Sequence, residues 1–450
     1  MNHQIKVEIK DFRVIHHAAI ILDGITVVAG ENGCGKSTIS KLLYQTYKTA
    51  NHFDAILKKE VRHKISALFT KTGDIAERCY YYAASSYKDR FTASMNFFGK
   101  EWQTTLNKSF DALKQQVQMA GDALKKDIAE MPPKSATEKL VESVSKVSKL
   151  HASEEISKEL FIQHIDELCG QIIAEITAAE VTTTLRPISV LDRAIQTMFS
   201  LQRLHGQFNI SEGTSLLTDT GNKRLNKSFC VKQQVYIDTP MAIGVQAYTY
   251  WQDLNTLLQK GSSYSAAYSA AYDAVYEDEF TVNLSADVLE GDVALNVNKD
   301  FGFAQGFIYK RKDGLSINLL DCATGLKSFA ILQLLYKNGT LHNDTLVIID
   351  EPEAHLHPQW VVEYARLIVL LNKIAGVRFF IASHHPDMIS VIRYIAEKEK
   401  RLETLNFYLA KKIQDCYLYD YNLLKQNIEP IFTSFNIALD RINQYASTAQ

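Results

Sequence analysis

The chain has few cysteines, and they are not arranged to cross-link it or to bind zinc. Its 450 residues include six scattered cysteines and no C-x-x-C pair. This usage disfavours a disulfide scaffold and a zinc site and indicates a reducing compartment. Long apolar runs are also missing, both within the chain and at its start, Met1–Lys6. We therefore expect no membrane span and no signal peptide, and a cytoplasmic location.

The chain also lacks an excess of positive or negative charge. The 49 Lys and Arg residues nearly balance the 51 Asp and Glu residues, which gives a net charge of −2 at pH 7. No global field therefore draws the protein toward nucleic acid or an anionic membrane, although a local basic patch is not excluded. The hydrophobic share of 46% is that of an ordinary globular protein. The length suits about two to three domains.

One glycine-rich segment carries the strongest chemical signal. Residues 30–37 read G-x-x-x-x-G-K-S without substitution, after a β-branched apolar run at 25–29 and before a possible helix at 38–47. Strand, glycine-rich turn and helix form the context of a phosphate-binding loop, in which backbone N–H groups and the helix N-terminus hold phosphate oxygens. Lys36 is predicted to reach the β- and γ-phosphates and Ser37 to bind Mg²⁺. The predicted nucleotide-binding residues here are Asn32, Gly33, Cys34, Gly35, Lys36, Ser37 and Thr38.

A second part of the same site is predicted about 300 residues later. Residues 345–352 are predicted to form an apolar strand that ends in two acids, Asp350 and Glu351, which is the pattern of a Walker B element. Asp350 is predicted to contact the metal directly or through water, and Glu351 to polarise the attacking water. His355 and His357 resemble a metal-ligand pair, but the acids already have a nucleotide role and no third ligand is evident.

A histidine follows the next apolar strand. Residues 379–383 lead to His384 and His385 in a turn before Pro386. A polar residue at the end of a strand beside the phosphate-loop strand can contact the γ-phosphate. The alternative is a solvated turn histidine.

Together these segments resemble the ABC-type ATPases of the RecF, SMC and overcoming-lysogenization-defect (OLD) group. The matching residues are the opening IKDFR, the loop GENGCGKST, the run IIDEPEAHLHP and the later ASHHP. The resemblance covers roughly residues 1–50 and 230–395. It implies an α/β P-loop NTPase of ABC type, with a mixed sheet flanked by helices and antiparallel N-terminal strands. It also implies that His384 is the switch histidine and that Arg13 approaches the nucleotide.

The family's signature segment is altered in this chain. The best match to L-S-G-G-Q is the run from Cys322 to Leu326, which opens an apolar helix through Leu335. Gly325 is kept, and Thr324 could supply the missing hydroxyl. In the family this segment completes the site of a second subunit, so the predicted residues acting in trans are Thr324, Gly325 and Lys327. The alternative is an ordinary helix start capped by Thr324.

The resemblance leaves the middle of the chain as an insertion. We expect an ATPase core in residues 1–50 and 231–450, and a helical insertion in residues 51–230 with a hairpin tip near 131–134. A stripe at helical spacing predicts the first arm, and a capping box at Ser135 predicts a return helix. The stripe comprises Trp102, Leu106, Phe110, Leu113, Val117, Ala120, Leu124 and Ile128, and the return arm Leu140, Val144, Val147, Ile156, Leu160, Leu168 and Ile172.

Several smaller sequence features add to the predicted domain organisation. The run 154–180 is acidic, which makes the arm a poor surface for DNA and better suited to a protein partner or simple solvation. A ridge of tyrosines at 264, 268, 272 and 276 is typical of a packing or oligomer face. Residues 280–320 alternate like strands. A strand ending at Asp238 or Thr239 falls where the family has its Q-loop, without a Gln there.

The tail of the chain gives evidence about a nuclease domain. The residues after His384 contain Asp415 and Asp420 but no D-x-D, and the run 417–419 is predicted as one strand before a closing helix. We therefore expect no Toprim nuclease fold there, and hydrolysis of ATP with Mg²⁺ as the activity.

Two functions fit these expectations. The first is an ATP-hydrolysing switch or sensor subunit of a bacterial anti-phage complex, resembling OLD-like ATPases of the PARIS and Septu type. Such a subunit forms dimers or larger rings around sandwiched nucleotide and acts with a separate effector, a Toprim or HNH nuclease, in response to a phage protein. The second is a DNA-repair clamp resembling RecF or SMC-like ATPases. A transporter subunit fits less well, because nothing in the sequence couples it to a membrane.

Overall fold

The computed structural model describes residues 4–83, 88–131, 158–259, 288–297 and 304–435. The chain divides into two compact units, which are described separately. The core unit comprises residues 1–51 and 188–450, and the helical unit comprises residues 52–187.

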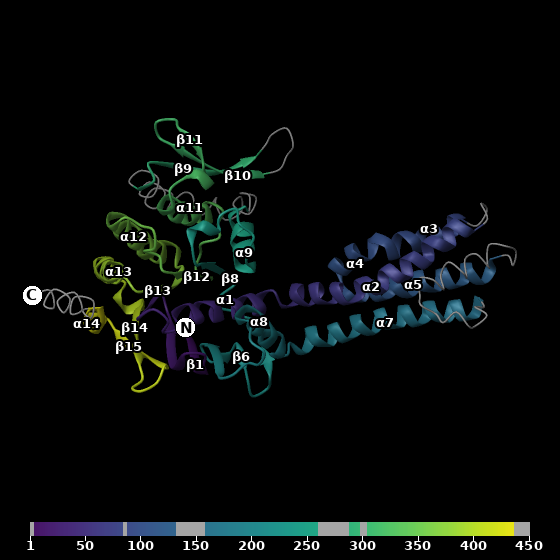
Figure 1. Cartoon of the computed structure of the whole chain (residues 1–450), viewed down its shortest axis with the longest axis horizontal. Coiled ribbons are helices and arrows are strands. Elements are labelled where there is room, and N and C mark those ends of the chain that lie inside the picture. The colour runs from purple at the N-terminus through teal and green to yellow at the C-terminus, as the bar shows by residue number, and fades with distance from the viewer. Residues whose placement is uncertain (1–3, 84–87, 132–157, 260–287, 298–303, 436–450) are drawn as a thin grey trace, which may run out of the picture. The chain divides into compact units, whose positions relative to one another are not determined.

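The core unit contains one mixed sheet of ten strands (Figure 1). Five neighbouring strands, β14, β3, β13, β12 and β8, run parallel, and the strands on the β14 side add antiparallel pairs. This confirms the predicted α/β class with antiparallel N-terminal strands. In order across the sheet, the strands are β5 (Ser215–Leu216), β4 (Gln207–Glu212), β1 (Ile5–Phe12), β2 (Ile15–Leu22), β15 (Tyr419–Lys425), β14 (Leu405–Lys412), β3 (Ile25–Ala29), β13 (Arg378–Ser383), β12 (Thr345–Asp350) and β8 (Gln233–Ile237).

Helices and two smaller sheets complete the core unit. One small sheet has the order β11 (Ser316–Asn318), β10 (Ala304–Arg311) and β9 (Gly291–Val297), and the other pairs β6 (Thr218–Asp219) with β7 (Arg224–Leu225). The helices are α1 (Lys36–Asn51), α8 (Ser189–Phe199), α9 (Thr249–Leu258), α11 (Thr324–Lys337), α12 (Pro358–Ala375), α13 (Pro386–Lys398) and α14 (Glu429–Phe435).

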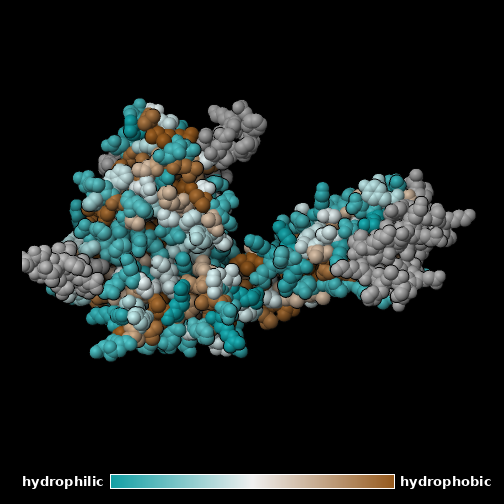
Figure 2. All heavy atoms as spheres, viewed as in Figure 1, coloured by the Kyte–Doolittle hydropathy of each residue, from teal (hydrophilic) through white to brown (hydrophobic). Residues whose placement is uncertain are grey.

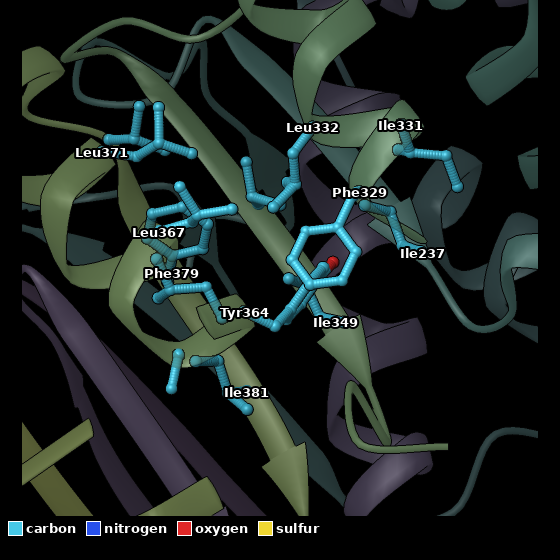
Figure 3. Close-up of a cluster of buried hydrophobic side chains, with 14 of the residues drawn as sticks. Ile237, Phe329, Ile331, Leu332, Ile349, Tyr364, Leu367, Leu371, Phe379 and Ile381 are labelled. Atoms are coloured by element: carbon cyan, nitrogen blue, oxygen red, sulfur yellow. The ribbon is translucent and has the colours of Figure 1, made fainter. Parts of the chain in front are cut away.

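A continuous apolar core lies between one face of the main sheet and helices α11 and α12. Alternate strand residues face these helices, as the two-residue period of a strand requires. Each large aliphatic or aromatic side chain buried here contributes about 1.5–3 kcal/mol. Figure 3 shows Phe329, Ile331 and Leu332 of α11 and Tyr364, Leu367 and Leu371 of α12 beside the strand residues Ile237, Ile349, Phe379 and Ile381.

The second boundary of the insertion differs from the prediction. The core unit resumes at residue 188 rather than 231. The reason is that β4 pairs antiparallel with β1, which places residues 207–212 in the main sheet. The Glu212 carboxylate, which is fully buried, then accepts hydrogen bonds from the Phe229 and Cys230 amides at 2.8 and 3.1 Å.

The tail after His384 also differs from the single strand predicted at 417–419. It forms two strands, β14 and β15, and β14 pairs in parallel with β3, the strand that precedes the phosphate loop. The described residues after His384 therefore help to complete the main sheet. No Toprim-like unit is present in the part of the tail that the structure describes.

The helical unit contains α2 (Phe53–Tyr82), a helix that was not predicted from the sequence. Both α2 and α5 (Phe110–Glu130) pack against α7 (Lys158–Leu185) (Figure 1). The predicted stripe is buried in its core, except for Ala120, which is partly buried. It runs over two helices rather than one, because Ser109 ends α4 (Trp102–Lys108) and caps α5 by accepting a hydrogen bond from the Ala112 amide at 3.0 Å. The described part of this unit also contains α3 (Lys88–Asn96), followed by a π-helical turn, Phe97–Glu101.

Several predictions fall outside the described residues. These are the hairpin tip, the return helix between 135 and 157, the tyrosine ridge and the strand expected at 280–284. The second arm, where it is described, is the uninterrupted helix α7, with Leu168 and Ile172 buried. Its acids are partly neutralised, since Lys114 pairs with Glu180 at 2.5 Å and Lys125 pairs with Asp166.

The surface is mainly hydrophilic in the view of Figure 2, with hydrophobic residues reaching it over the region of α11 and β9–β11. Exposed apolar side chains on segments next to α11 in the chain or in space include Leu315, Leu320 and Met241. Among the residues that the structure describes, no helix is both long and apolar enough to cross a membrane.

Candidate functional site

The predicted site residues leave the main sheet at one edge. Ala29, the last residue of β3, is in register with Ser383, and Ala382 is in register with Asp350. Because the three strands are parallel, the residues that follow them emerge side by side. The phosphate loop, Glu351 and His384 are therefore brought together from segments more than 300 residues apart in sequence.

The loop between β3 and α1 depends on glycine. Gly33 and Gly35 have φ values of 84° and 100°, which residues with a side chain rarely adopt. At Gly35 space is limiting too, because a Cβ would lie 3.0 Å from side-chain carbons of Val14 and Ile15. The Thr38 amide donates to the Gly35 carbonyl at 3.0 Å, which begins the first turn of α1.

Lys36 lies within this loop, and its side chain is turned onto the loop backbone. Its Nζ donates to the carbonyls of Gly30 and Glu31 at 2.8 and 3.0 Å and lies 3.9 Å from Sγ of Cys34. The residue is only 6% exposed. Among the described residues no carboxylate forms an ion pair with Lys36. A shielded ammonium with only carbonyl partners keeps its charge available for an anion.

Asp350 is held by hydroxyl groups from neighbouring elements. Ser40 of α1 donates to Oδ1, and Tyr236 of β8 donates to Oδ2 at 2.8 Å. Ser37 provides a further side-chain hydrogen bond. Burial raises the pKa of Asp350 above its ordinary value, and the three hydroxyl donors offset part of that rise. The two residues predicted to share Mg²⁺, Ser37 and Asp350, are thus adjacent.

The donors at this position fit a hard divalent cation. A buried carboxylate whose charged form is costly gains from a nearby cation, and the hydroxyl and carboxylate oxygens are ligands that Mg²⁺ accepts. Among the described residues no cluster of three or more His, Cys, Asp or Glu could hold a metal by itself. This suits Mg²⁺, which usually binds one or two carboxylates together with phosphate and water. It also leaves His355 and His357 without a metal cluster.

Glu351 occupies an unusual backbone conformation. Its φ is 48°, which costs a residue with a Cβ about 1–3 kcal/mol. Its amide donates to the Ala382 carbonyl at 2.7 Å, which fixes the turn after β12 to strand β13. The side chain is 45% exposed, and its Oε1 lies 3.5 Å from Nδ1 of His384. Strain of this kind is concentrated at functional sites.

The signature-like segment has an open helix start. Helix α11 begins at Thr324, and the residue in the N-cap position is Ala323, whose side chain makes no capping hydrogen bond. The alternative in which Thr324 caps an ordinary helix is therefore wrong. The Thr324 hydroxyl instead contacts Sδ of Met241 at 3.9 Å. The first amides of this 14-residue helix have no side-chain cap.

The other two signature residues have internal roles. A Cβ on Gly325 would lie 2.8 Å from ring carbons of Trp360, so this glycine permits close packing of α11 on α12. Lys327 is almost fully buried and donates to the Leu320 carbonyl at 2.7 Å. Its ammonium thus stabilises the turn before α11.

Arg13 lies in the turn between β1 and β2, beside the Val14 that contacts the phosphate loop. Its guanidinium carbon is 5.0 Å from the centroid of the Phe199 ring, a cation–π distance. An approach of this guanidinium to nucleotide stays a prediction.

A recess of about 580 Å³ adjoins the start of the phosphate loop. It is bounded by Gly30 and Glu31 together with the end of β14, the start of β15 and α14. Lys411, Lys412 and Tyr419 contribute to its lining. The tail thus forms one wall beside the loop, a role that its sequence did not indicate.

Two residues that hold Asp350 were not predicted from the sequence. Ser40 lies one helical turn after Lys36, which places both on one side of α1. Tyr236 is in register with Ile348, two residues before Asp350, so both side chains lie on the same face of the sheet. These spacings are visible in the sequence once the pairing of β8 with β12 is known.

Comparison with known proteins identifies the family of the chain. The profile of the AAA ATPase domain family matches residues 5–389, which is most of the chain. The chain belongs to this family and is an ATPase. ATPases of this family use ATP and normally Mg²⁺. No curated protein matches the chain.

Solved structures with distant similarity are heads of SMC proteins. One is the Smc head bound to the C-winged helix domain of ScpA, with 11% identity, 94% of this chain and 98% of that chain covered, and a TM-score of 0.39. Another is the Smc head domain with a coiled coil and joint from Pyrococcus yayanosii, with 12% identity, 96% and 100% coverage, and a TM-score of 0.37. The SMC head domain from Thermotoga maritima has 10% identity, 93% and 98% coverage, and a TM-score of 0.35. At TM-scores below 0.5 these similarities carry no argument about what this chain binds.

Proposed function

We propose that ATP binds at the edge of the main sheet where the phosphate loop, Glu351 and His384 emerge. The observation that carries this proposal is the hydrogen-bonded contact of Ser37 and Asp350 beside a buried Lys36 that forms no ion pair with a described residue. Lys36 leaves the loop carbonyls to bind the β- and γ-phosphates. Ser37 and Asp350 hold Mg²⁺, which supplies positive charge against the charge that develops on the phosphates.

Glu351 is the general base in this proposal. Its half-exposed carboxylate lies at the sheet edge next to the loop and accepts a proton from the attacking water. His384 contacts the γ-phosphate from the adjacent strand end. The backbone contact of Glu351 with Ala382 supports this arrangement, because it fixes the base relative to the strand that carries the histidine.

We infer that hydrolysis requires a second copy of the chain. The uncapped start of α11 carries Thr324 on a partly exposed surface, and exposed apolar residues lie beside it. Such a helix start binds anions through its free amides and its dipole. Nucleotide sandwiched between the phosphate loop of one subunit and this helix of another would then make a dimer or a larger ring. Lys327 supports the segment from within, since its ammonium is bound to Leu320.

We propose that this ATPase is a cytoplasmic switch or sensor subunit of an anti-phage complex. The support is the resemblance of its motifs to OLD-like ATPases and the short helical unit inserted after α1. A nucleotide-dependent assembly can hold or release an effector, such as a Toprim or HNH nuclease, when a phage protein shifts its equilibrium. In this proposal the effector is a separate protein.

The competing DNA-clamp function is tested by salt-dependent binding. A clamp that neutralises phosphates should bind duplex DNA with a steep negative dependence of log affinity on log salt concentration. We expect little duplex binding by the wild-type protein, with or without ATP, between low and physiological salt. A steep slope would replace the sensor proposal with the clamp.

Partner capture tests the sensor function directly. The Glu351→Gln variant should retain ATP and accumulate in the assembled state. Co-expression of this variant with the proteins encoded beside it should yield a complex containing a nuclease. Release of that nuclease on addition of a phage lysate, and failure of Lys36→Ala to capture it, are the expected results. If no neighbouring protein binds in either nucleotide state, the sensor function is wrong.

A further inference from the structure

The carboxylate of Glu353 is buried between the segment after β12 and the end of β13. Its side chain is only 4% exposed. Oε1 accepts hydrogen bonds from the Ser383 hydroxyl at 2.9 Å and from the His384 amide at 3.1 Å. Oε2 is shielded from solvent and has no hydrogen-bond partner among the described residues. A buried, half-satisfied carboxylate is costly and indicates a role beyond packing.

Glu353 fixes the backbone where β13 ends. Ser383 is fully buried, and while its hydroxyl donates to Glu353 its oxygen accepts from the His385 amide at 3.1 Å. The carboxylate therefore orders residues 383–385. It accepts hydrogen bonds directly from the Ser383 hydroxyl and the His384 amide, and it acts on the His385 amide through the Ser383 hydroxyl. The chain enters α13 at Pro386, so the position of the His384 side chain depends on this short network.

The His384 ring lies between two carboxylates. Its Nδ1 is 3.5 Å from Oε1 of Glu353 and 3.5 Å from Oε1 of Glu351. Nδ1 is shielded from solvent although 41% of the side chain is exposed, so the exposed part is the remainder of the ring. Carboxylates only accept hydrogen bonds. A small rotation of the ring would therefore join Nδ1–H to one carboxylate and leave Nε2 on the solvent side.

We propose that Glu353 is the positioning residue of His384. It holds the proton on Nδ1 and the ring in one orientation, so that Nε2 is presented to the γ-phosphate while Glu351 stays free to act on water. Carboxylates orient catalytic and metal-binding imidazoles in this way in other enzymes. This inference rests on the proposed function, in which His384 contacts the γ-phosphate and Glu351 is the base.

The isosteric variants Glu353→Gln and Glu351→Gln test this positioning role. They form a matched pair because both carboxylates lie 3.5 Å from Nδ1 of His384. The side-chain ¹⁵N signals of His384, assigned with a His384→Gln variant, report where the ring proton resides. We expect Glu353→Gln to shift these signals away from the Nδ1–H form and to lower kcat roughly 10- to 100-fold with little change in KM for ATP. Glu351→Gln should abolish turnover and leave the His384 signals unchanged. Glu353→Asp, which keeps the charge, should restore part of kcat.

Controls distinguish failure of the positioning role of Glu353 from failure of the proposed function. Glu363→Gln, at a surface ion pair with Arg366, should leave kcat and the histidine signals unchanged. If Glu353→Gln lowers thermal stability but the folded protein keeps the wild-type His384 signals, Glu353 is only structural. If Glu353→Gln keeps wild-type kcat and signals while Glu351→Gln is inactive, the positioning role alone is overturned. If Glu351→Gln turns over normally, the proposed function itself fails.

Discussion

The hydroxyl of Tyr236 donates a 2.8 Å hydrogen bond to Asp350 across two neighbouring parallel strands, β8 and β12. Burial raises the pKa of Tyr236, so the hydroxyl stays protonated and remains a donor. Asp350, the predicted metal ligand, is thus held by β8, the last strand of the sheet on this side, as well as by Ser40 of α1.

Tyr236→Phe should destabilise the protein through this bond. Loss of a hydrogen bond to a charged group costs about 1.5–3 kcal/mol of unfolding free energy. Denaturation by urea at neutral pH measures it. Tyr364→Phe is the matched control, because Tyr364 is as buried, at 2%, and its hydroxyl makes no hydrogen bond within the described residues. Equal losses for the two variants would contradict a specific role for the Tyr236 hydroxyl.

Asp350→Asn should stabilise the nucleotide-free protein while it abolishes hydrolysis. Because burial raises the pKa of Asp350, the folded state binds its proton more tightly than the unfolded state does. Stability is therefore lost as pH rises from the ordinary carboxyl range through the raised pKa, and the amide removes this loss. Calorimetry without nucleotide should show a higher Tm for the variant at pH 7–8 and a smaller difference near pH 5. A variant less stable at pH 8 than the wild type would refute the assignment.

Gly325→Ala should destabilise the core unit. The new Cβ would lie 2.8 Å from the Trp360 ring, and overpacking of this kind costs about 1–3 kcal/mol. Gly221→Ala is the control, since the nearest atom to its Cβ would be 3.5 Å away. The change in calorimetric Tm relative to that control is the measurement. A Tm equal to the control would mean that α11 and α12 shift apart without cost.

Lys36→Ala should remove nucleotide binding and leave the fold intact. Truncating one partner of a shielded charge pair costs about 2–5 kcal/mol. Titration of a fluorescent ATP analogue in the presence of Mg²⁺ reports the affinity, and circular dichroism checks the fold. Lys41→Ala, on the same helix, is the control and should bind normally. Wild-type affinity in Lys36→Ala would remove the phosphate-loop assignment.

Thr324→Ala should separate binding from hydrolysis. If the hydroxyl acts on nucleotide held by a second subunit, the variant binds ATP normally and turns over slowly. Mixing it with Lys36→Ala gives a sharper result. A mixed dimer of the two variants should regain one complete site, because the intact loop of one chain meets the intact Thr324 of the other, whereas a chain with both substitutions paired with wild type should have none. Normal turnover by Thr324→Ala would show that the altered signature works without this hydroxyl.

Local patterns predicted the strands that carry the chemistry. Residues 25–29 form a strand with the predicted limits, and the strand predicted over 345–352 ends at Asp350. Both are continuous apolar runs between polar segments, and both are buried on each face of a parallel sheet. The glycine-rich turn and the acids then follow at fixed offsets, so the site's main residues could be named without the fold.

The remaining features depend on pairing between distant segments. Residues 207–212 and 405–425 alternate only weakly, and nothing in them indicates that they join β1 and β3. The residues that hold Asp350 and the backbone of His384 in place were not predicted, for the same reason. Ser40, Tyr236 and Glu353 become meaningful only when their elements meet the ends of β12 and β13. The uncapped start of α11 likewise required the backbone, since Thr324 is one residue too late to cap it.

The pairing of β3 has a consequence during synthesis. Ile25 pairs with Phe379 on one side and with Leu405 on the other, so a nascent chain carries this apolar strand with both edges open until the last strands emerge. At ordinary translation rates the delay is on the order of tens of seconds. The helical unit, whose contacts are local, can fold on the ribosome in the meantime. We therefore expect nucleotide binding only after β13 and β14 have paired with β3.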